Sequence, residues 1–480
     1  SSEVIAATTA VTAEALVVCG PVVGKVTDTS ANILLEVDGS AKVKCTATPA
    51  GGGAPVEVER SARVWTPVVF RLEGLLPETE YTLSFTGIAA AHTRLLQERG
   101  CKIRTFPPPD RVTSLRLIAV SCDYPSRLED GGANPWCDVA ELCKSGRCDV
   151  MLHLGDQVYT WENGRMTAAN KAIEGVRRSF TTAEVASRME NNAKEKLQES
   201  YQSTWSLKEQ AKAFAHSSHL MIWSDNDVTN DFTVLRKADG SQEYMSEFLS
   251  VAMQVYRIYQ RSLWDPAAAE MTLDSFKQLP ELREWHFHTY GACGIFLLDM
   301  RGNRISANGE LMPGLPALIS ESQRTAIVEA FNTPGLSCFL LCAEIPFLGP
   351  DPATVKELAE KMAFLKDHWQ YNLDELTWLL DLCFDFKAKA EGREVILLGG
   401  DIHVGVDSSV TDSKTGLSIR QITTSPITNS ASVFHCPLEG QIGERYAYKH
   451  TAFPNKRNYC TIDLAFSEGK VTTKVDLVCV

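Results

Sequence analysis

The chain has 480 residues, of which 44% are hydrophobic, and a formal net charge of −13 at pH 7. This length allows a large hydrophobic core and more than one domain. The acidic balance argues against a nucleic-acid-binding surface, which needs clustered Lys and Arg, and no apolar run approaches the ~20 residues of a transmembrane helix.

The first residues, SSEVIAATTAVTAEALVVCG, lack the basic segment and compact apolar stretch that mark a signal peptide. The chain has no N-x-Ser/Thr sequon, and several of its 14 cysteines lie in apolar runs, where cysteine behaves as a small buried hydrophobe. These features favour a cytoplasmic location, with a secreted mature form as the alternative. The cysteines in apolar runs are Cys293, Cys338, Cys342 and Cys383.

Residues from about 16 to 106 form short segments of alternating apolar and polar residues, separated by Gly, Pro or Asp. This spacing is typical of a β-sandwich, so we predict an N-terminal β-sandwich domain over residues 1–106. The segment FPPPD follows, and its prolines can continue neither a strand nor a helix interior, which makes it the predicted domain linker. The expected strands are 31–38, 42–49, 56–62, 66–75 and 80–88.

From residue 111 to the end, short and nearly continuous apolar runs recur, as expected of strands buried on both faces. Several of the segments between them have the three- and four-residue apolar spacing of helices. We therefore predict a layered α/β domain with a central sheet over residues 111–480. The expected strands are 115–122, 149–156, 220–225, 294–301, 338–344 and 395–401, and the expected helices are 182–205, 243–264 and 374–386.

Four of these strands end in a potential metal ligand, and a fifth leads into an acid and an arginine. In open α/β sheets ligands bind at the carboxyl ends of the strands, so these side chains should meet at one edge. Each alone could be a helix cap or turn residue, but the four together, with His403 added, favour a cation site. The ligands are Cys122, Asp156, Asp225 and Asp401, and the fifth strand leads into Asp299 and Arg301.

Two motifs carry most of this signal. In HLGDQVYT, Asp156 follows a turn at Gly155 and could bridge two metals, while Tyr159 would favour a ferric ion; His153 in the same motif is expected to be a core residue. In GGDIHVG, Asp401 and His403 would lie on the same side of an extended chain. Carboxylate and imidazole suit a transition metal or a calcium neighbour, and Cys122 would be a soft thiolate partner.

The segments SCDY, LHLGDQVY, WSDNDVTND, LLDMRGNR, DHWQYNLDELTWLL and GGDIHVG resemble, in this order, those of PhoD-like phosphatases. These proteins, often called alkaline phosphatase D, belong to the calcineurin-like metallophosphoesterase superfamily. GDQVY and GGDIH are the most specific pieces. GPVVGKVTDTSANILLEV and LEGLLPETEYTLSFTG are similar to the N-terminal β-sandwich of the family, so the likeness covers nearly the whole chain.

The resemblance implies a four-layer α/β/β/α catalytic domain that hydrolyses a small-molecule phosphomonoester or phosphodiester, with a metal-bound hydroxide attacking phosphorus. It implies iron and calcium as the metals, with zinc or manganese as alternatives. Iron would be held by Cys122, Asp156, Tyr159 and Asp401, and calcium would lie near Asp156, Asp225, Asn230 and His403. Arg301 would grip phosphate oxygens bidentately, or else form a salt bridge to Asp299 or another acid beneath the site.

The chain departs from the family pattern Asp-Asp-His at Ser224-Asp225-Asn226. The missing His is expected near the leaving group, and Asn226 can donate a hydrogen bond there but cannot supply a proton. Asn226 could instead bind a metal through its carbonyl oxygen, and His216 or His219 are expected at the far end of the preceding strand. The alternative function is therefore a metal-retaining pseudoenzyme that acts as a binding or structural subunit.

Overall fold

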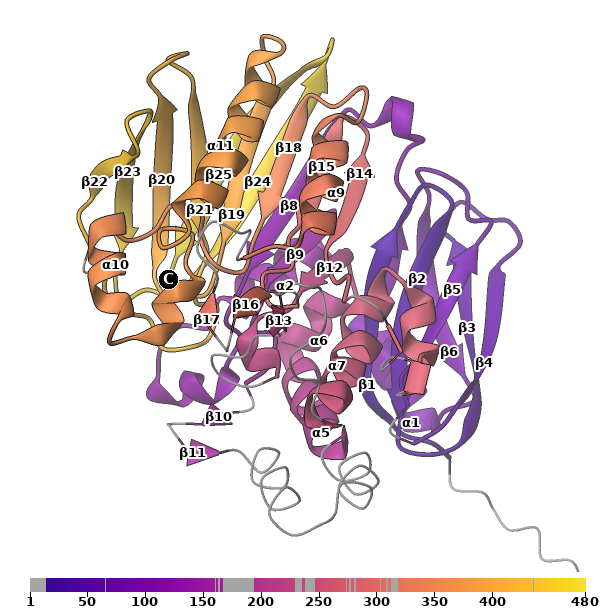
Figure 1. Cartoon of the computed structure of the whole chain (residues 1–480). Coiled ribbons are helices and arrows are strands. Elements are labelled where there is room, and N and C mark those ends of the chain that lie inside the picture. Colours follow the sequence, from indigo (N-terminus) through magenta and orange to yellow (C-terminus); the bar gives the residue numbers. More distant parts are fainter. Residues whose placement is uncertain are drawn as a thin grey trace, which may run out of the picture.

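A computed structural model of the chain has a mixed α/β fold with several sheets (Figure 1). Within the described part of the chain, no helix is long and apolar enough to cross a membrane. The structure describes residues 14–480 except 65, 160, 163–164, 167–193, 229–234, 238–246, 273, 276–277, 280–281, 303, 308–309, 312–317 and 435.

The N-terminal strands form two sheets, in the orders β1-β2-β5 and β4-β3-β6-β7, which share one hydrophobic cluster. The five predicted strands are all present. A helix, α1 (Ala90–Arg99), interrupts the region that we predicted to be entirely β, and Leu96 is its single buried residue, so it has no helical apolar spacing to recognise. The strands are β1 (Val17–Val26), β2 (Ser30–Val37), β3 (Ala41–Pro49), β4 (Val56–Ala62), β5 (Val68–Glu73), β6 (Glu80–Thr86) and β7 (Lys102–Arg104).

The six apolar runs of the second region all form strands, but they are divided between two sheets, so the prediction of one central sheet is wrong. The five-stranded sheet has the order β12-β9-β8-β24-β25, and the eight-stranded sheet has the order β14-β15-β18-β19-β21-β20-β23-β22. An apolar run shows that both faces of a strand are buried, but not which strand lies beside it. The runs are β8 (Ser114–Val120), β9 (Val150–Leu154), β12 (Ser218–Ile222), β15 (Cys293–Leu297), β18 (Cys338–Cys342) and β19 (Glu394–Gly399).

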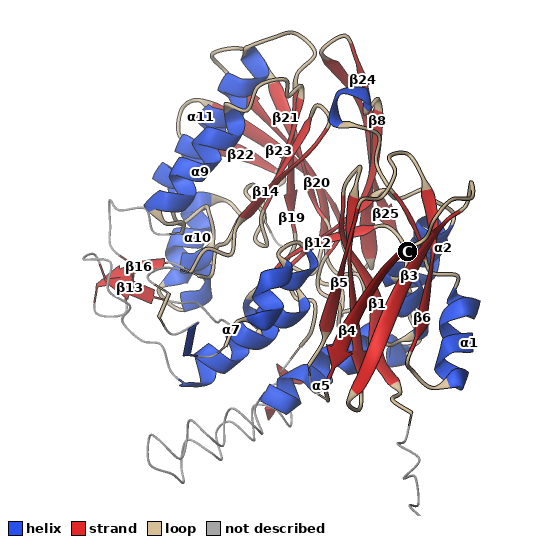
Figure 2. Cartoon of the chain, turned by 90° about the vertical axis from the view of Figure 1, so that its right-hand side faces the viewer, coloured by secondary structure: helices blue, strands red, loops and turns tan. Residues whose placement is uncertain are grey.

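The eight-stranded sheet buries a different partner on each face. Along β15, Ile295 and Leu297 join a cluster with β8, β9 and β12, whereas Phe296 joins a second cluster with helices α9 (Glu321–Phe331) and α11 (Leu373–Ala388). Side chains from α2 (Trp136–Lys144), α5 (Lys194–Trp205), α6 (Lys208–Phe214) and α7 (Glu247–Tyr259) belong to the first cluster. Figure 2 shows α9, α10 and α11 together on one side of the sheets.

The remaining strands extend the two large sheets or form two small sheets of their own, in the orders β10-β11 and β13-β16-β17. Part of the predicted helix 182–205 lies outside the described residues, and the rest is α5. The remaining strands are β10 (Trp161–Glu162), β11 (Arg165–Met166), β13 (Leu235–Lys237), β14 (His286–Tyr290), β16 (Arg304–Ala307), β17 (Glu310–Leu311), β20 (Gly405–Asp412), β21 (Ser418–Thr423), β22 (Glu439–Ile442), β23 (Tyr446–Phe453), β24 (Asn458–Ser467) and β25 (Lys470–Cys479), and the remaining helix is α10 (Pro352–Ala359).

The sheet β1-β2-β5 is buried on both of its faces. Ile33 and Phe70 face the other N-terminal sheet, whereas Leu34 and Val69 belong to the large cluster that also holds β8, β9 and β12. Glu36 of β2 is fully buried in this contact; it accepts hydrogen bonds from Tyr259 Oη (2.6 Å) and Gln202 Nε2 (2.8 Å). Burial raises the pKa of Glu36 from its ordinary value of 4.5 to about 7.

This buried carboxyl predicts a pH dependence of stability. Between pH 4.5 and about 7 the folded state retains the Glu36 proton, whereas the unfolded state has lost it. We therefore expect the free energy of unfolding to fall by up to about 3 kcal/mol as the pH rises through this window. Urea unfolding at about pH 5 and about pH 8 measures the change in stability. The change should be smaller in Glu36→Gln, in which other buried acids with raised pKa values remain, and it should be unchanged in Glu59→Gln, an exposed control on β4. Equal pH dependence in wild type and Glu36→Gln would contradict it.

Candidate metal centre

The backbone is left-handed at four of the predicted ligands. The φ angles are 57° at Cys122, 55° at Asp156, 61° at Asp401 and 55° at His403. Non-glycine residues rarely adopt this conformation, and such residues concentrate at functional sites. Each of the first three follows the end of a strand, β8, β9 or β19, so the turn lifts its side chain out of the sheet at the carboxyl edge.

Glycine permits the strand ends to approach one another at this edge. Gly155 has a φ of 90°, and a Cβ added there would lie 2.6 Å from the Cβ of Ser224, which follows β12. A side chain would therefore push the loop after β9 away from the loop after β12. The glycine holds Asp156 and Asp225 close enough to share a ligand.

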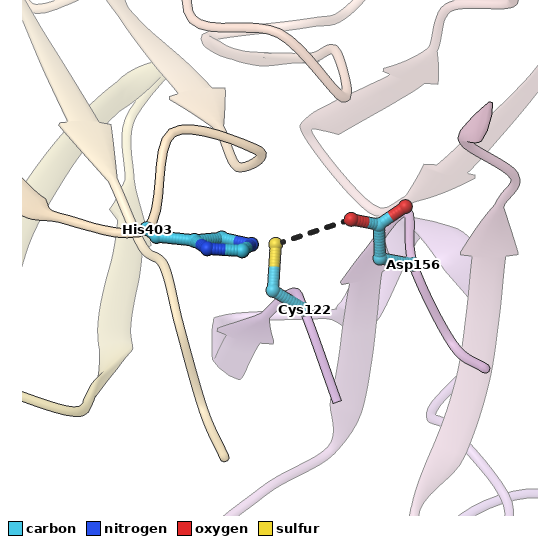
Figure 3. Close-up of side chains that lie close together, drawn as sticks. All are labelled: Cys122, Asp156 and His403. Atoms are coloured by element: carbon cyan, nitrogen blue, oxygen red, sulfur yellow. Dashed lines mark hydrogen bonds between the residues drawn. The ribbon is translucent and has the colours of Figure 1, made fainter. Parts of the chain in front are cut away.

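Five of the predicted ligands lie together in two overlapping groups. Ligand atoms of Cys122, Asp156 and His403 lie within 4.8 Å of one another, and so do those of Asp156, Asp225 and Asp401. Figure 3 shows the Cys122 thiol between the His403 ring and the Asp156 carboxylate, with Sγ 3.5 Å from Asp156 Oδ2. Asp156 belongs to both groups, so its carboxylate lies where a bridging ligand would be.

Tyr159 joins the first group through its hydroxyl. Tyr159 Oη donates to Asp156 Oδ2 (2.8 Å) and lies 3.2 Å from His403 Nε2. Its ring stacks on that of Tyr124, with the ring centroids 4.8 Å apart. Predicted ligand Asn230 lies outside the described residues.

Burial and mutual repulsion dominate the electrostatics of the two groups. Burial, and next the charge of Asp225, raise the pKa of Asp156 to about 7, and the same causes raise the pKa of Asp401. Burial and the Asp156 charge raise the pKa values of Cys122 and Tyr159. Burial lowers the pKa of His403 to about 4, so its imidazole is neutral and able to bind a metal at pH 7.

These residues fit a centre of two cations. Buried acids that repel one another favour their protonated forms, and a bound cation reverses this preference because it attracts the ionised forms. The group with Cys122 and His403 offers sulfur and nitrogen, which transition metals prefer, whereas the group with Asp225 and Asp401 offers carboxylate oxygens alone. The donor set therefore suits one softer and one harder cation with a shared carboxylate.

Arg301 is engaged by acids beside the centre. Its Nε lies 2.6 Å from Glu344 Oε1, one terminal nitrogen lies 3.2 Å from Asp367 Oδ2, and the other lies 3.5 Å from Asp225 Oδ1. Asp299 does not pair with this guanidinium; it accepts the Arg301 backbone N–H at 3.0 Å instead. These contacts agree with the ion-pair role expected of Arg301, and its role towards phosphate stays a prediction.

Asn226 faces the shared carboxylate. Its backbone N–H points to Asp156 Oδ1 and its Nδ2 to Asp156 Oδ2, each at 3.3 Å, and the residue is 8% exposed. In this orientation the amide nitrogen, not the carbonyl oxygen, points towards the centre. His153 and His219 contact each other at 2.9 Å in the core, as expected, with no contact to the two groups among the described residues.

Asp227, the last acid of this loop, holds the ligand loops together. Its Oδ2 accepts the backbone N–H groups of Asp156 (3.0 Å) and Ser224 (2.8 Å). Its Oδ1 accepts the N–H of Gln157 (2.9 Å) and Nε2 of Gln260 (2.9 Å). A single buried carboxylate thus joins the loops after β9 and β12 to the residues that follow α7.

Asp227→Asn is expected to destabilise the protein by about 2 to 4 kcal/mol, because either orientation of the amide places an NH₂ group against two buried N–H donors. The loss should appear as a lower midpoint in urea unfolding and as lower metal content at equal protein concentration. Asp110→Asn, an exposed control, should change neither quantity. Asp227→Asn with wild-type stability would show that the four hydrogen bonds do not hold the loops.

Sequence reasoning missed two residues of the centre, Asp227 and Glu344. Glu344 follows β18 just as Asp156 follows β9, so the rule that selected the other strand-end acids could have found it. Asp227 does not follow a strand directly, and the contacts that join it to Asp156 and Gln157 are with backbone N–H groups of another loop, which a local pattern does not predict.

A family model described as "PhoD-like phosphatase" matches residues 117–474. Among solved structures, one titled "Structure of PhoD" has a TM-score of 0.62 over 96% of this chain and 91% of that chain, at 14% identity, which shows a common fold. Another, titled "GAP50 the anchor in the inner membrane complex of Plasmodium", covers 76% of this chain and 84% of that chain at 11% identity, and its TM-score of 0.35 is too low to show a common fold. Comparison with curated proteins gives no match.

Proposed function

The chain belongs to the PhoD-like phosphatase family, whose model matches residues 117–474, and we propose that it is a metal-dependent hydrolase of small-molecule phosphoesters. The observation that carries the proposal is the position of Asp156 in both ligand groups. Two-metal hydrolases require such a shared carboxylate, because it fixes the distance between two ions that act on one phosphate.

We propose iron for the group of Cys122, Asp156 and His403, with Tyr159 as its fourth ligand, and calcium for the group of Asp156, Asp225 and Asp401; zinc or manganese are the alternatives. The resemblance implies Asp401 as an iron ligand and His403 as a neighbour of calcium. We assign His403 to iron and Asp401 to calcium instead, because their ligand atoms belong to the corresponding two groups. When bound, the ions would neutralise phosphate charge and lower the pKa of the attacking water.

The protein's own groups would orient the substrate. Asn226 Nδ2 is directed at the shared carboxylate, so a phosphate on the ions would lie within its reach, and the amide would stabilise charge on the leaving oxygen by a hydrogen bond. The Asn226 amide is not acidic enough to protonate the leaving oxygen, so we expect esters with good leaving groups to react fastest.

We also propose the domain division 1–106 and 111–480, with an N-terminal β-sandwich and a four-layer α/β/β/α catalytic domain. The hydrophobic cluster shared by the two N-terminal sheets supports the β-sandwich. The side chains of β15, which alternately pack against the other sheet and against helices, support the layered catalytic domain.

A cavity of about 640 Å³ beside the centre is our candidate for the site of the organic part of the ester. Tyr124 and Tyr159 line it, with Ser200 and Ser203 of α5 and Gln210 of α6. Tyr159 connects the cavity to the ligand groups, because this lining residue donates a hydrogen bond from its Oη to Asp156. Its size falls within the roughly 300 to 1,000 Å³ of small-molecule sites.

The test is turnover of p-nitrophenyl phosphate, bis(p-nitrophenyl) phosphate and the p-nitrophenyl ester of thymidine 5′-phosphate, after measurement of metal content. We expect stoichiometric metal and hydrolysis of at least one ester. A higher kcat/KM for the bulkier esters would support the cavity's role, and equal values would exclude it. Metal without turnover on any ester, after loading with iron, calcium, zinc and manganese, would instead favour the binding-subunit alternative suggested by Asn226.

A further inference from the structure

Glu344 reaches the metal centre from the eight-stranded sheet, although most of the ligands follow strands of the other sheet. It follows β18 and is fully buried, and its carbonyl oxygen accepts the backbone N–H of Gly400 at 2.8 Å. A Cβ added at Gly155 would lie 3.2 Å from the Cβ of Glu344, so the glycine also makes room for this side chain. Glu344 therefore sits between the strand ends that carry Asp156 and Asp401.

The Glu344 carboxylate contacts two groups that both touch Asp225. Its Oε1 lies 2.6 Å from Arg301 Nε, and its Oε2 contacts Ser224 Oγ. Arg301 reaches Asp225 Oδ1 at 3.5 Å, and Ser224 Oγ donates to the same oxygen at 3.0 Å. Ser224 stands where the family pattern has an aspartate, and here its hydroxyl lies between the carboxylates of Glu344 and Asp225.

The charges in this cluster bear directly on cation binding. Arg301 is a permanent positive charge beside Asp225, so it repels a cation on that carboxylate and competes with it for the same oxygens. Glu344 and Asp367 hold the guanidinium by its other nitrogens, at 2.6 and 3.2 Å, and offset its charge. Without the Glu344 charge, Arg301 would keep Asp367 and Asp225 as its acidic partners, and its pull on Asp225 would increase.

We propose that Glu344 is a positioning residue for the cation held by Asp156, Asp225 and Asp401. It neutralises and anchors Arg301, so that the Asp225 carboxylate binds the cation instead of the guanidinium. Arg301 thereby serves as a buried counter-ion of the acidic cluster. The inference rests on the metal centre of the proposed function, but not on the reaction.

The test is Ca²⁺ binding by calorimetry to the full chain after dialysis against a chelator. Glu344→Gln keeps the size of the side chain and removes its charge, and should weaken Ca²⁺ binding about 10- to 100-fold, as is usual for residues that orient metal ligands. The double variant Glu344→Gln/Arg301→Gln should recover most of the lost affinity, because it also removes the positive charge of Arg301 that Glu344 no longer neutralises. A role in packing alone predicts no such rescue.

Glu284→Gln is the matched control. Glu284 is also fully buried and paired with an arginine, since Arg257 Nε donates to it at 2.8 Å, but it contacts none of the ligands in the described part of the chain. Its variant should bind Ca²⁺ as the wild type does. Thermal unfolding of each variant without metal identifies any that fail to fold.

Two outcomes would overturn the inference while leaving the metal centre intact: unchanged Ca²⁺ affinity in Glu344→Gln, or an equal loss in the single and double variants. A wild-type protein that binds no cation of any kind would overturn both the inference and the proposed metal centre.

Discussion

Asp156→Asn is expected to lower phosphoester hydrolysis at least about 1,000-fold, or about 4 kcal/mol in transition-state stabilisation. Asp156 is the residue common to both ligand groups, and the substitution removes the charge that would hold two ions at one distance. Metal analysis of the purified variant should show the loss of at least one ion per chain. Steady-state turnover of p-nitrophenyl esters gives the rate.

The same variant separates loss of chemistry from loss of folding. Burial and Asp225 raise the pKa of Asp156 to about 7, so in the metal-free protein its ionised carboxylate destabilises the folded state as the pH rises towards and above that value. At about pH 8, metal-free Asp156→Asn should therefore unfold at about the same denaturant concentration as the metal-free wild type, because the removed charge repulsion offsets the weakened hydrogen bonds from Tyr159 and Asn226. Asp138→Asn, an exposed control on α2, should retain full metal and activity. An active Asp156→Asn would refute the proposed site.

Asn226→His is expected to raise turnover of esters with poor leaving groups by about 100-fold, within the range of general acid catalysis. Asn226 Nδ2 lies 3.3 Å from the shared carboxylate, so a histidine there would present an N–H to a leaving oxygen near the ions. An alkoxide leaves slowly without a proton, whereas p-nitrophenolate leaves readily without one. The gain should therefore appear with phenyl or alkyl phosphates and be small with p-nitrophenyl phosphate.

The dependence on leaving group is the measurement that identifies the mechanism. Plots of log kcat against leaving-group pKa should be steep for the wild type and shallower for Asn226→His. Asn226→Gln, which keeps an amide at this position, should leave the slope unchanged. An equal rate change for all esters in Asn226→His would mean that the histidine acts by altering metal binding rather than by donating a proton.

The strand ends were the most predictable part of the centre. Cys122, Asp156, Asp225 and Asp401 each follow a short buried run, and this local pattern survives whichever sheet the strand joins. The overlap of the two ligand groups at Asp156 could not be derived from spacing, because it depends on how β19 of one sheet meets β8, β9 and β12 of the other.

Contacts between distant segments account for what the sequence did not reveal. Arg301 forms ion pairs with Glu344 and Asp367, which lie far along the chain and have no motif in common. The helix α1 has a local reason instead, because a single buried leucine leaves no apolar periodicity. The ion pairs of Arg301 are tertiary contacts, which a local sequence pattern cannot predict.

The left-handed backbone at Cys122, Asp156, Asp401 and His403 also bears on attempts to engineer a more robust form of the protein. Glycine adopts this conformation at little cost, whereas other residues lose about 1 to 2 kcal/mol each. A selection for heat resistance alone would thus reward glycine at the positions where the chemistry needs a side chain. Mutant libraries selected for stability should keep these four residues unchanged, since a gain in stability at these positions would remove the ligands of the centre.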